Sequence, residues 1–257
     1  MNRKRNVLLT NDDGIDAAGL WALYEALAPD HAVTVVAPDR ERSAVGHGIT
    51  LHEPLRSTVT RRNGCPGAVS VSGLPADCIK LALDQLVPSA PDLVIAGINP
   101  GANVGININY SGTVAAAKEA ALAGIPSLAV SLAVDGSGGT PEGFLRAAHL
   151  VRQLAERVLE EGLPYGTFLN VNIPIGGIAP CGVRLCRHAL QPPRETFECR
   201  HDPRRRPYYW PGRDRQTFAD DPLLDGAVLE AGFIAVTPLT CDGTDYTLLA
   251  TLEGWGL

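Results

Sequence analysis

Residues 7–43, VLLTNDDGIDAAGLWALYEALAPDHAVTVVAPDRERS, decide the fold. Val7–Thr10 and Ala32–Ala37 are short aliphatic runs of the kind that form buried strands, and Gly19–Leu27 between them is typical of a helix. A strand, a helix and a second strand in succession predict a βαβ unit in which the two strands run parallel.

The same alternation continues downstream. Further strands are predicted at Val69–Ser72, Asp92–Ala96, Ser127–Leu132 and Phe168–Ile173, and further helices at Pro75–Leu86, at Thr113–Ala123 and from Pro141 onward. Near-continuous apolar strands between helices favour a parallel sheet covered on both faces. We therefore predict an α/β fold with a doubly wound, mostly parallel sheet.

Composition narrows the function classes. The 257 residues carry 22 Lys and Arg against 28 Asp and Glu, a formal net charge of −6, which disfavours binding to a nucleic-acid duplex or an anionic membrane. Val7-Leu8-Leu9 is too short for an export signal and is followed by Asn11-Asp12-Asp13, and no apolar stretch approaches the ~20 residues of a membrane span. We expect a cytoplasmic protein whose cysteines are free thiols.

The sequence changes character after Phe168–Ile173. Cys181 to Arg215 is rich in Arg and Pro, lacks apolar periodicity and contains Tyr208-Tyr209-Trp210. Such a segment is most simply a hairpin or arm that packs against another subunit. We predict one domain, 1–257, with its core at about 1–175 and 225–257 and an oligomerisation arm at about 180–215.

Polar loops follow three of the predicted strands, at the edge where open α/β sheets bind ligands. Thr10–Gly14 holds adjacent carboxylates, Asp12 and Asp13, whose repulsion a divalent cation would offset, although a helix-capping turn explains this segment equally well. Ala37–Ser43 supplies charges and a hydroxyl, or is merely a solvated connection. Gly97–Gly105 (GINPGANVG) supplies glycines for close approach and asparagine amides for a ligand.

Tyr110-Ser111-Gly112-Thr113 opens the predicted Ala-rich helix. Free backbone N–H groups and two hydroxyls at a helix N-terminus suit a phosphate, and a simple N-cap is the alternative. The glycine loop matches neither a dinucleotide fingerprint nor a Walker A loop. A cation beside a phosphate pocket, without an evident Cys, Ser or His nucleophile, indicates metal-assisted phosphoester hydrolysis.

Other interpretations stay open. A non-catalytic nucleotide- or phosphate-binding module would need the anion site but not the paired carboxylates, and a nicotinamide-dependent oxidoreductase would need glycines where Asp12 and Asp13 stand. His47 is interpreted as a structural or substrate-lining residue rather than a proton donor. The Cys-Arg-His triplets at 186–188 and 199–201 do not have the spacing of a closed zinc site, and the arginines at 204–206 favour an oligomer contact or a solvated face.

Several blocks together resemble the survival protein SurE family: LLTNDDG (8–14), APDRERS (37–43), GHGITL (46–51), PADCIKLAL (75–83), PDLVIAGIN (91–99), YSGTVAAA (110–117), LNVNIP (169–174), YYW (208–210) and VTPL (236–239). The resemblance implies a Rossmann-like core and a metal-dependent phosphatase that acts on nucleoside 5′- and 3′-monophosphates, in some members also on short polyphosphate. It also implies homodimers or homotetramers formed through the arm.

The resemblance further implies a ligand set. Asp12, Asp13, Ser43 and Asn99 would hold one divalent cation per subunit, Mg²⁺ or Mn²⁺, with Asp12 and Asp13 as the catalytic carboxylates. The residues that would face the nucleotide phosphate are Asn11, Asn103, Ser111, Gly112 and Thr113.

Overall fold

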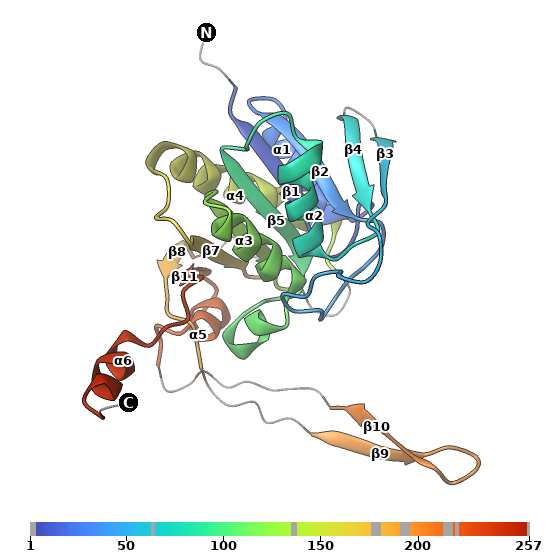
Figure 1. Ribbon diagram of the computed structural model, residues 1–257, viewed down its shortest axis with the longest axis vertical. Coiled ribbons are helices and arrows are strands. Elements are labelled where there is room, and N and C mark those ends of the chain that lie inside the picture. Colours follow the sequence, from blue (N-terminus) through green and yellow to red (C-terminus); the bar gives the residue numbers. More distant parts are fainter. Residues whose placement is uncertain are drawn as a thin grey trace.

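A nine-stranded sheet in the order β3-β4-β2-β1-β5-β6-β7-β11-β8 forms the centre of the protein (Figure 1). The computed structural model describes residues 4–62, 65–134, 138–175, 181–190, 196–212, 218 and 221–255. The strands of the sheet are β1 (Asn6–Thr10), β2 (Ala32–Pro38), β3 (Ser57–Arg62), β4 (Cys65–Val71), β5 (Leu93–Pro100), β6 (Ser127–Leu132), β7 (Thr167–Ile173), β8 (Val183–Leu185) and β11 (Ile234–Thr240). The helices are α1 (Ala18–Leu27), α2 (Pro75–Leu81), α3 (Gly112–Leu122), α4 (Pro141–Glu161), α5 (Asp225–Glu230) and α6 (Tyr246–Glu253).

The sheet is doubly wound, as the sequence predicts. β1 pairs in parallel with β2 on one side and with β5 on the other, so the strand order reverses between β1 and β5. On one side β2 pairs in parallel with β4, and on the other β5 pairs in parallel with β6 and β6 with β7. β3 and β11 are antiparallel to their neighbours β4 and β7, which makes the sheet mostly rather than wholly parallel.

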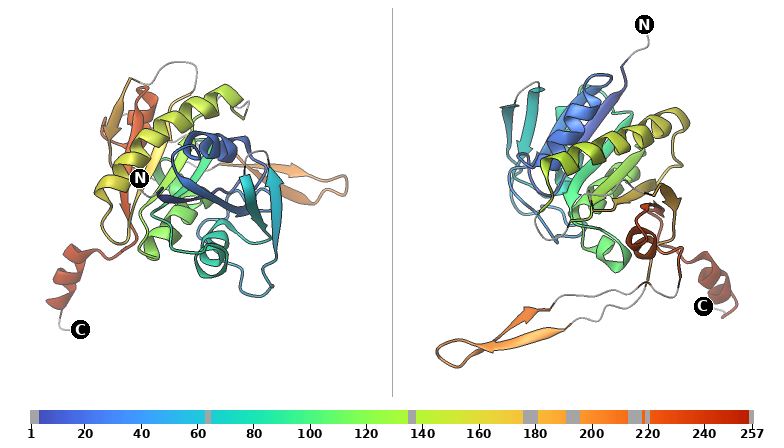
Figure 2. Two further views of the ribbon diagram at one scale, coloured as in Figure 1. Left: turned by 90° about the horizontal axis from the view of Figure 1, so that it is seen from above. Right: turned by 180° about the vertical axis from the view of Figure 1, so that it is seen from behind.

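Helices cover both faces because the central strands are apolar on both sides. Val7 and Leu9 of β1 pack in one core cluster with residues of α1 and α4. Leu8, between them, points to the other face and packs in a cluster with residues of α2 and α3. Figure 2 shows α1 and α4 side by side on their face of the sheet. The prediction of helices on both faces is confirmed.

The structure corrects some element boundaries. The helix predicted at Pro75–Leu86 is α2 followed by a π-helical turn, Ala82–Leu86, in which Val87 N donates to Ala82 O. The strands β3 and β8 and the helix α5 were not predicted. β3 forms at the sheet edge with five of its six residues exposed, so its sequence, STVTRR, lacks the apolar pattern of a buried strand.

A separate hairpin consists of β9 (Phe197–His201) and β10 (Pro207–Pro211), paired antiparallel. Figure 1 shows it projecting away from the sheet. Both strands are exposed along their whole length. The predicted hairpin is therefore present, although residues 180, 191–195 and 213–215 of the predicted arm lie outside the described residues. Within the described part of the chain, no helix has the length and apolar character to cross a membrane.

Candidate active site

The loops after β1 and β2 meet at the carboxyl-end edge of the sheet. Arg42 N donates to Asp12 O at 2.7 Å, and Ile15 N donates to Pro38 O at 2.8 Å, so the two loops are joined by backbone hydrogen bonds. Gly14 has a φ of 102°, and a Cβ at this position would lie 3.0 Å from the carbonyl carbon of Arg40. Only glycine allows this approach without strain.

Asp12, on the loop after β1, contacts the start of α3. It is 4% exposed, and its Oδ1 accepts a hydrogen bond from Thr113 Oγ1 at 2.5 Å. Burial raises the pKa of Asp12, and the hydrogen bond from Thr113 opposes that rise. A Cβ on Gly112 would lie 2.7 Å from Asp12 Cβ and 3.0 Å from its Oδ2. The carboxylate therefore occupies space that a side chain at residue 112 would take.

Asp13 carries an unsatisfied oxygen. Its Oδ2 is buried and has no hydrogen-bond partner among the described residues. Burial raises the pKa of Asp13 to about 7, and the charges of Asp12 and Glu41 add to that rise. A buried carboxylate oxygen without a partner, beside a second carboxylate, is unfavourable in the ionised state. These two residues fit a bound cation, which would remove that unfavourable interaction.

Ser43 lies in the loop after β2 together with Glu41, an acid that is not among the predicted site residues. Its Oγ donates to Glu41 Oε1 at 2.7 Å, which leaves the hydroxyl oxygen's lone pairs available to a ligand. Glu41 is exposed, and its charge acts on both aspartates. The mixed charges of APDRERS were the available signal for this third carboxylate.

Asn99 lies near the carboxyl end of β5, the strand beside β1, and Asn103 lies on the loop that follows β5. Asn99 Nδ2 donates to Gly101 O at 2.7 Å, so its Oδ1 is the atom left for a cation. Asn103 is buried, and its Nδ2 donates to Ser131 Oγ at 2.8 Å. The Asn99 geometry fits an oxygen ligand, whereas the Asn103 amide nitrogen is already engaged by a protein group.

Two buried asparagines on β7 hold the Asn103 backbone. Asn170 Nδ2 and Asn172 Nδ2 donate to Asn103 O at 2.8 and 3.0 Å, and Asn172 Oδ1 accepts from Asn103 N at 2.8 Å. No role in the site is predicted for these two asparagines from their sequence context. Their alternation in an otherwise apolar strand, LNVNI, was the signal, because a buried polar side chain needs a partner.

Ser111 is the N-cap of α3. Its Oγ accepts from Val114 N at 3.2 Å, so the capping alternative for this hydroxyl is confirmed. Asn11 also has a local role, since its side chain donates to Gly14 O at 2.9 Å and accepts from Gly14 N at 3.2 Å. Asn11 thus shapes the loop that presents Asp12 and Asp13. Phosphate binding by these residues stays a prediction.

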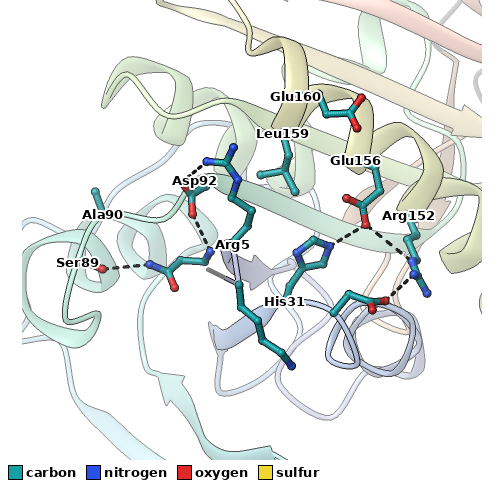
Figure 3. Close-up of a pocket in the computed structure, with 12 residues that line it drawn as sticks. Arg5, His31, Ser89, Ala90, Asp92, Arg152, Glu156, Leu159 and Glu160 are labelled. Atoms are coloured by element: carbon teal, nitrogen blue, oxygen red, sulfur yellow. Dashed lines mark hydrogen bonds and ion pairs between the residues drawn. The ribbon is translucent and has the colours of Figure 1, made fainter. Parts of the chain in front are cut away.

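A different pocket, of about 770 Å³, lies at the opposite edge of the sheet (Figure 3). Lys4, Arg5 and Asn6 at the start of β1 line it, with His31 before β2 and Glu156 on α4. Several of its charged groups are already paired: Arg5 pairs with Asp92 and Arg152 with Asp30, and His31 Nε2 lies 2.9 Å from Glu156 Oε1. None of the predicted site residues lines this pocket.

The two Cys-Arg-His triplets belong to different parts of the structure. Cys186 is buried and lies 3.1 Å from Thr237 Oγ1, whereas Cys199 is exposed on the hairpin strand β9. In the described ranges, no group of three or more His, Cys, Asp and Glu side chains is placed to hold a metal. The candidate cation site is not such a group, because two of its four predicted ligands, Ser43 and Asn99, are a serine and an asparagine.

The fold and the site together define a doubly wound α/β protein with paired acids and a helix N-terminus at its topological switch point. The family profile described as survival protein SurE matches residues 7–194. A relative from Desulfatibacillum aliphaticivorans, named 5′-nucleotidase SurE, is 52% identical over 254 residues, 97% of this chain and 98% of its own. A relative of the same name from Geobacter sulfurreducens is 46% identical over 98% of this chain and 94% of its own.

A solved structure agrees with these relatives. The crystal structure of the SurE protein from Aquifex aeolicus superposes with a TM-score of 0.84 at 35% identity, covering 98% of this chain and 100% of the other. This chain belongs to the survival protein SurE family.

Proposed function

We propose that this protein is a phosphomonoesterase that hydrolyses nucleoside 5′- and 3′-monophosphates with the help of one Mg²⁺ or Mn²⁺ per subunit. The observation that carries the proposal is the buried Oδ2 of Asp13, which has no hydrogen-bond partner in the described part of the chain and lies beside Asp12 at the N-terminus of α3. The names of the relatives, 5′-nucleotidase SurE, support the nucleotide as substrate. Short polyphosphate is a further proposed substrate, and we also propose a cytoplasmic homodimer or homotetramer.

Four residues would hold the cation: Asp12, Asp13, Ser43 and Asn99. The cation would supply charge neutralisation for the phosphate and activation of a water molecule. The buried carboxylates, the free Oδ1 of Asn99 and the available Ser43 oxygen form an oxygen-only donor set, which suits a hard divalent ion.

The remaining residues form or support the phosphate site. The first backbone N–H groups of α3 provide hydrogen-bond donors and the positive end of a helix dipole for the phosphate oxygens. Thr113 holds Asp12 in place through its hydroxyl, and Gly112 leaves the space that both the carboxylate and a phosphate need. Asn103, fixed by Asn170 and Asn172, closes the loop over the same edge.

The test is hydrolysis of p-nitrophenyl phosphate and of a panel of nucleotides with Mg²⁺, Mn²⁺ or EDTA. We expect metal-dependent turnover in the wild type and a loss of at least about 1,000-fold in Asp12→Asn and in Asp13→Asn, with melting curves that still show a folded protein. Asp16→Asn is the matched control, because Asp16 belongs to the same loop but its side chain is 95% exposed. Retention of most activity in either variant would refute the proposal.

A non-catalytic phosphate-binding module remains the alternative. The α3 N-terminus alone would support it, and it would show phosphate binding with no turnover in any divalent ion. The adjacent carboxylates argue against this alternative, because two repelling acids weaken anion binding unless a cation is present.

A further inference from the structure

A cavity of about 220 Å³ adjoins the candidate active site across the start of α3. Ser111, Val114 and Lys118 on one face of the helix line the cavity, while the neighbouring Thr113 bonds to Asp12. Gly46 N donates to Tyr110 O at 2.9 Å, which fastens the loop carrying His47 to the same helix start. The cavity is therefore within reach of a group attached to a phosphate at α3.

The lining suits a flat, uncharged group with polar edges. Phe168 and Leu239 give apolar walls, and His47, His188 and Thr240 give polar contacts. The lining residues, all of them described, include Lys118 but no carboxylate. Apolar walls with a few polar groups are the usual composition of a small-molecule site, and the absence of acids admits a ligand that carries a phosphate.

His47 and His188 each form a hydrogen bond to the protein through the Nε2 atom of the ring. His47 Nε2 lies 2.8 Å from Glu119 Oε2, and this hydrogen bond is the largest cause that lowers the pKa of Glu119, so the carboxylate is ionised and the imidazole donates. His188 Nε2 donates to the carbonyl oxygen of Gly105 at 2.9 Å. In each ring the Nδ1 atom is left to contact a ligand, because it forms no hydrogen bond with any described residue.

We propose that this cavity binds the nucleoside portion of the substrate and that His47 is the residue that determines specificity for it. The inference rests on the proposed function, since the nucleoside enters the cavity as the organic group of a phosphomonoester. Glu119, which also accepts from Lys80 at 3.2 Å, keeps the imidazole oriented. A nucleoside hydroxyl or amine would then donate to His47 Nδ1.

The test separates nucleoside binding from phosphate chemistry. Adenosine binding to the protein in EDTA is measured by calorimetry, because adenosine lacks the phosphate that would require the cation. We expect His47→Ala and Thr240→Trp each to weaken adenosine binding by roughly tenfold or more, the first by removing a hydrogen bond and the second by filling the cavity from an exposed position. His149→Ala, an exposed histidine on α4, should bind like the wild type.

Kinetics give the second measurement. In His47→Ala the KM for adenosine 5′-monophosphate should rise by a similar factor while kcat changes less. The inference is overturned if the wild type does not bind adenosine, if both cavity variants bind it normally, or if kcat falls with KM unchanged. Failure of the proposed function looks different: no turnover of p-nitrophenyl phosphate in any divalent ion, whatever the affinity for adenosine.

Discussion

At the scale of single residues, Asp13 should make the stability of the metal-free protein depend on pH. Its folded pKa of about 7 lies above the ordinary 3.8, so the folded state favours the protonated carboxyl. This contribution is fully present below about pH 4, declines by roughly 1 kcal/mol for each pH unit as the pH rises, and is lost above about pH 7. Removing the charge should therefore stabilise the protein most at high pH.

Urea melts of the wild type and of Asp13→Asn in EDTA, between pH 4 and pH 8, measure this dependence. We expect the variant to be more stable at pH 8 and the difference to shrink toward pH 4. Comparing the two proteins at each pH cancels the contributions of acids that do not interact with Asp13, which leaves Asp13 and its neighbours Asp12 and Glu41. A difference independent of pH would show that the Asp13 carboxyl titrates normally.

Gly112 is the second residue with a sharp prediction. The Cβ in Gly112→Ala would lie 2.7 Å from Asp12 Cβ and 3.1 Å from Pro75 Cγ, so the carboxylate must shift. We expect loss of at least about tenfold in Mg²⁺ or Mn²⁺ affinity by calorimetry, with a stability loss of about 1–3 kcal/mol from overpacking. Gly243→Ala is the control, because nothing lies within 4 Å of a Cβ there. Normal cation affinity in Gly112→Ala would mean that Asp12 does not hold the ion.

At the scale of elements, two helix N-caps offer a comparison between stability and function. Ser111 Oγ accepts from Val114 N at 3.2 Å in α3, and Thr140 Oγ1 accepts from Gly143 N at 3.1 Å in α4. Ser111→Ala and Thr140→Ala should each cost about 1 kcal/mol of unfolding free energy. Only Ser111→Ala should also raise the KM for phosphomonoesters, by several-fold, since α3 alone faces the site. Equal KM values in the two variants would assign Ser111 to helix capping alone.

The elements that could be predicted from sequence are those whose local pattern is complete. β1 is buried on both faces and so appears as an unbroken apolar run, and the adjacent acids after it stand out because repelling charges rarely follow a strand without a partner. β3 has no such pattern, since an exposed edge strand is formed by its pairing with β4 rather than by its own burial.

The residues that hold the site loops in place could not be predicted from sequence for a related reason. Asn170 and Asn172 of β7 donate hydrogen bonds to Asn103, which lies on the loop after β5. In the sheet, β6 lies between β5 and β7. Contacts between segments some 67 residues apart depend on strand order, which no local window contains. The role of Glu41 could not be predicted for the same reason, because its charge raises the pKa of Asp13 only where the loops after β1 and β2 meet.

At the scale of the whole molecule, the two edges of the sheet treat charge differently. At the amino-end edge, acids and bases neutralise one another, as Arg5 with Asp92 and Arg152 with Asp30 do. At the carboxyl-end edge, Asp12 and Asp13 have no cation among the described residues in ion-pair contact. Matched pairs stabilise a surface, whereas unmatched buried charge is retained where a ligand supplies the opposite charge. The unmatched acids therefore place the candidate site at the carboxyl-end edge, although the pocket of about 770 Å³ lies at the amino-end edge.

The hairpin β9–β10 leads to a prediction about assembly. All residues of its two strands are exposed, including Phe197 at 64%, Tyr209 at 62% and Trp210 at 55%. An isolated two-stranded hairpin is marginally stable in water, and clustered exposed aromatic side chains mark an interaction surface. A second copy of the chain is the partner we propose, because the same apolar surface is present on every subunit.

Light scattering coupled to gel filtration tests this assembly. We expect the wild type to elute as a dimer or tetramer and the double variant Phe197→Ser with Trp210→Ser to shift to a smaller mass. Phe197 pairs with Pro211 and Trp210 with Glu198, so the two side chains lie on opposite faces of the hairpin and the double variant removes an aromatic group from each face. Val59→Ser is the control, since Val59 is 67% exposed on the edge strand β3 and should leave the mass unchanged. A monomeric wild type, or a double variant with wild-type mass, would remove the hairpin from the subunit interface.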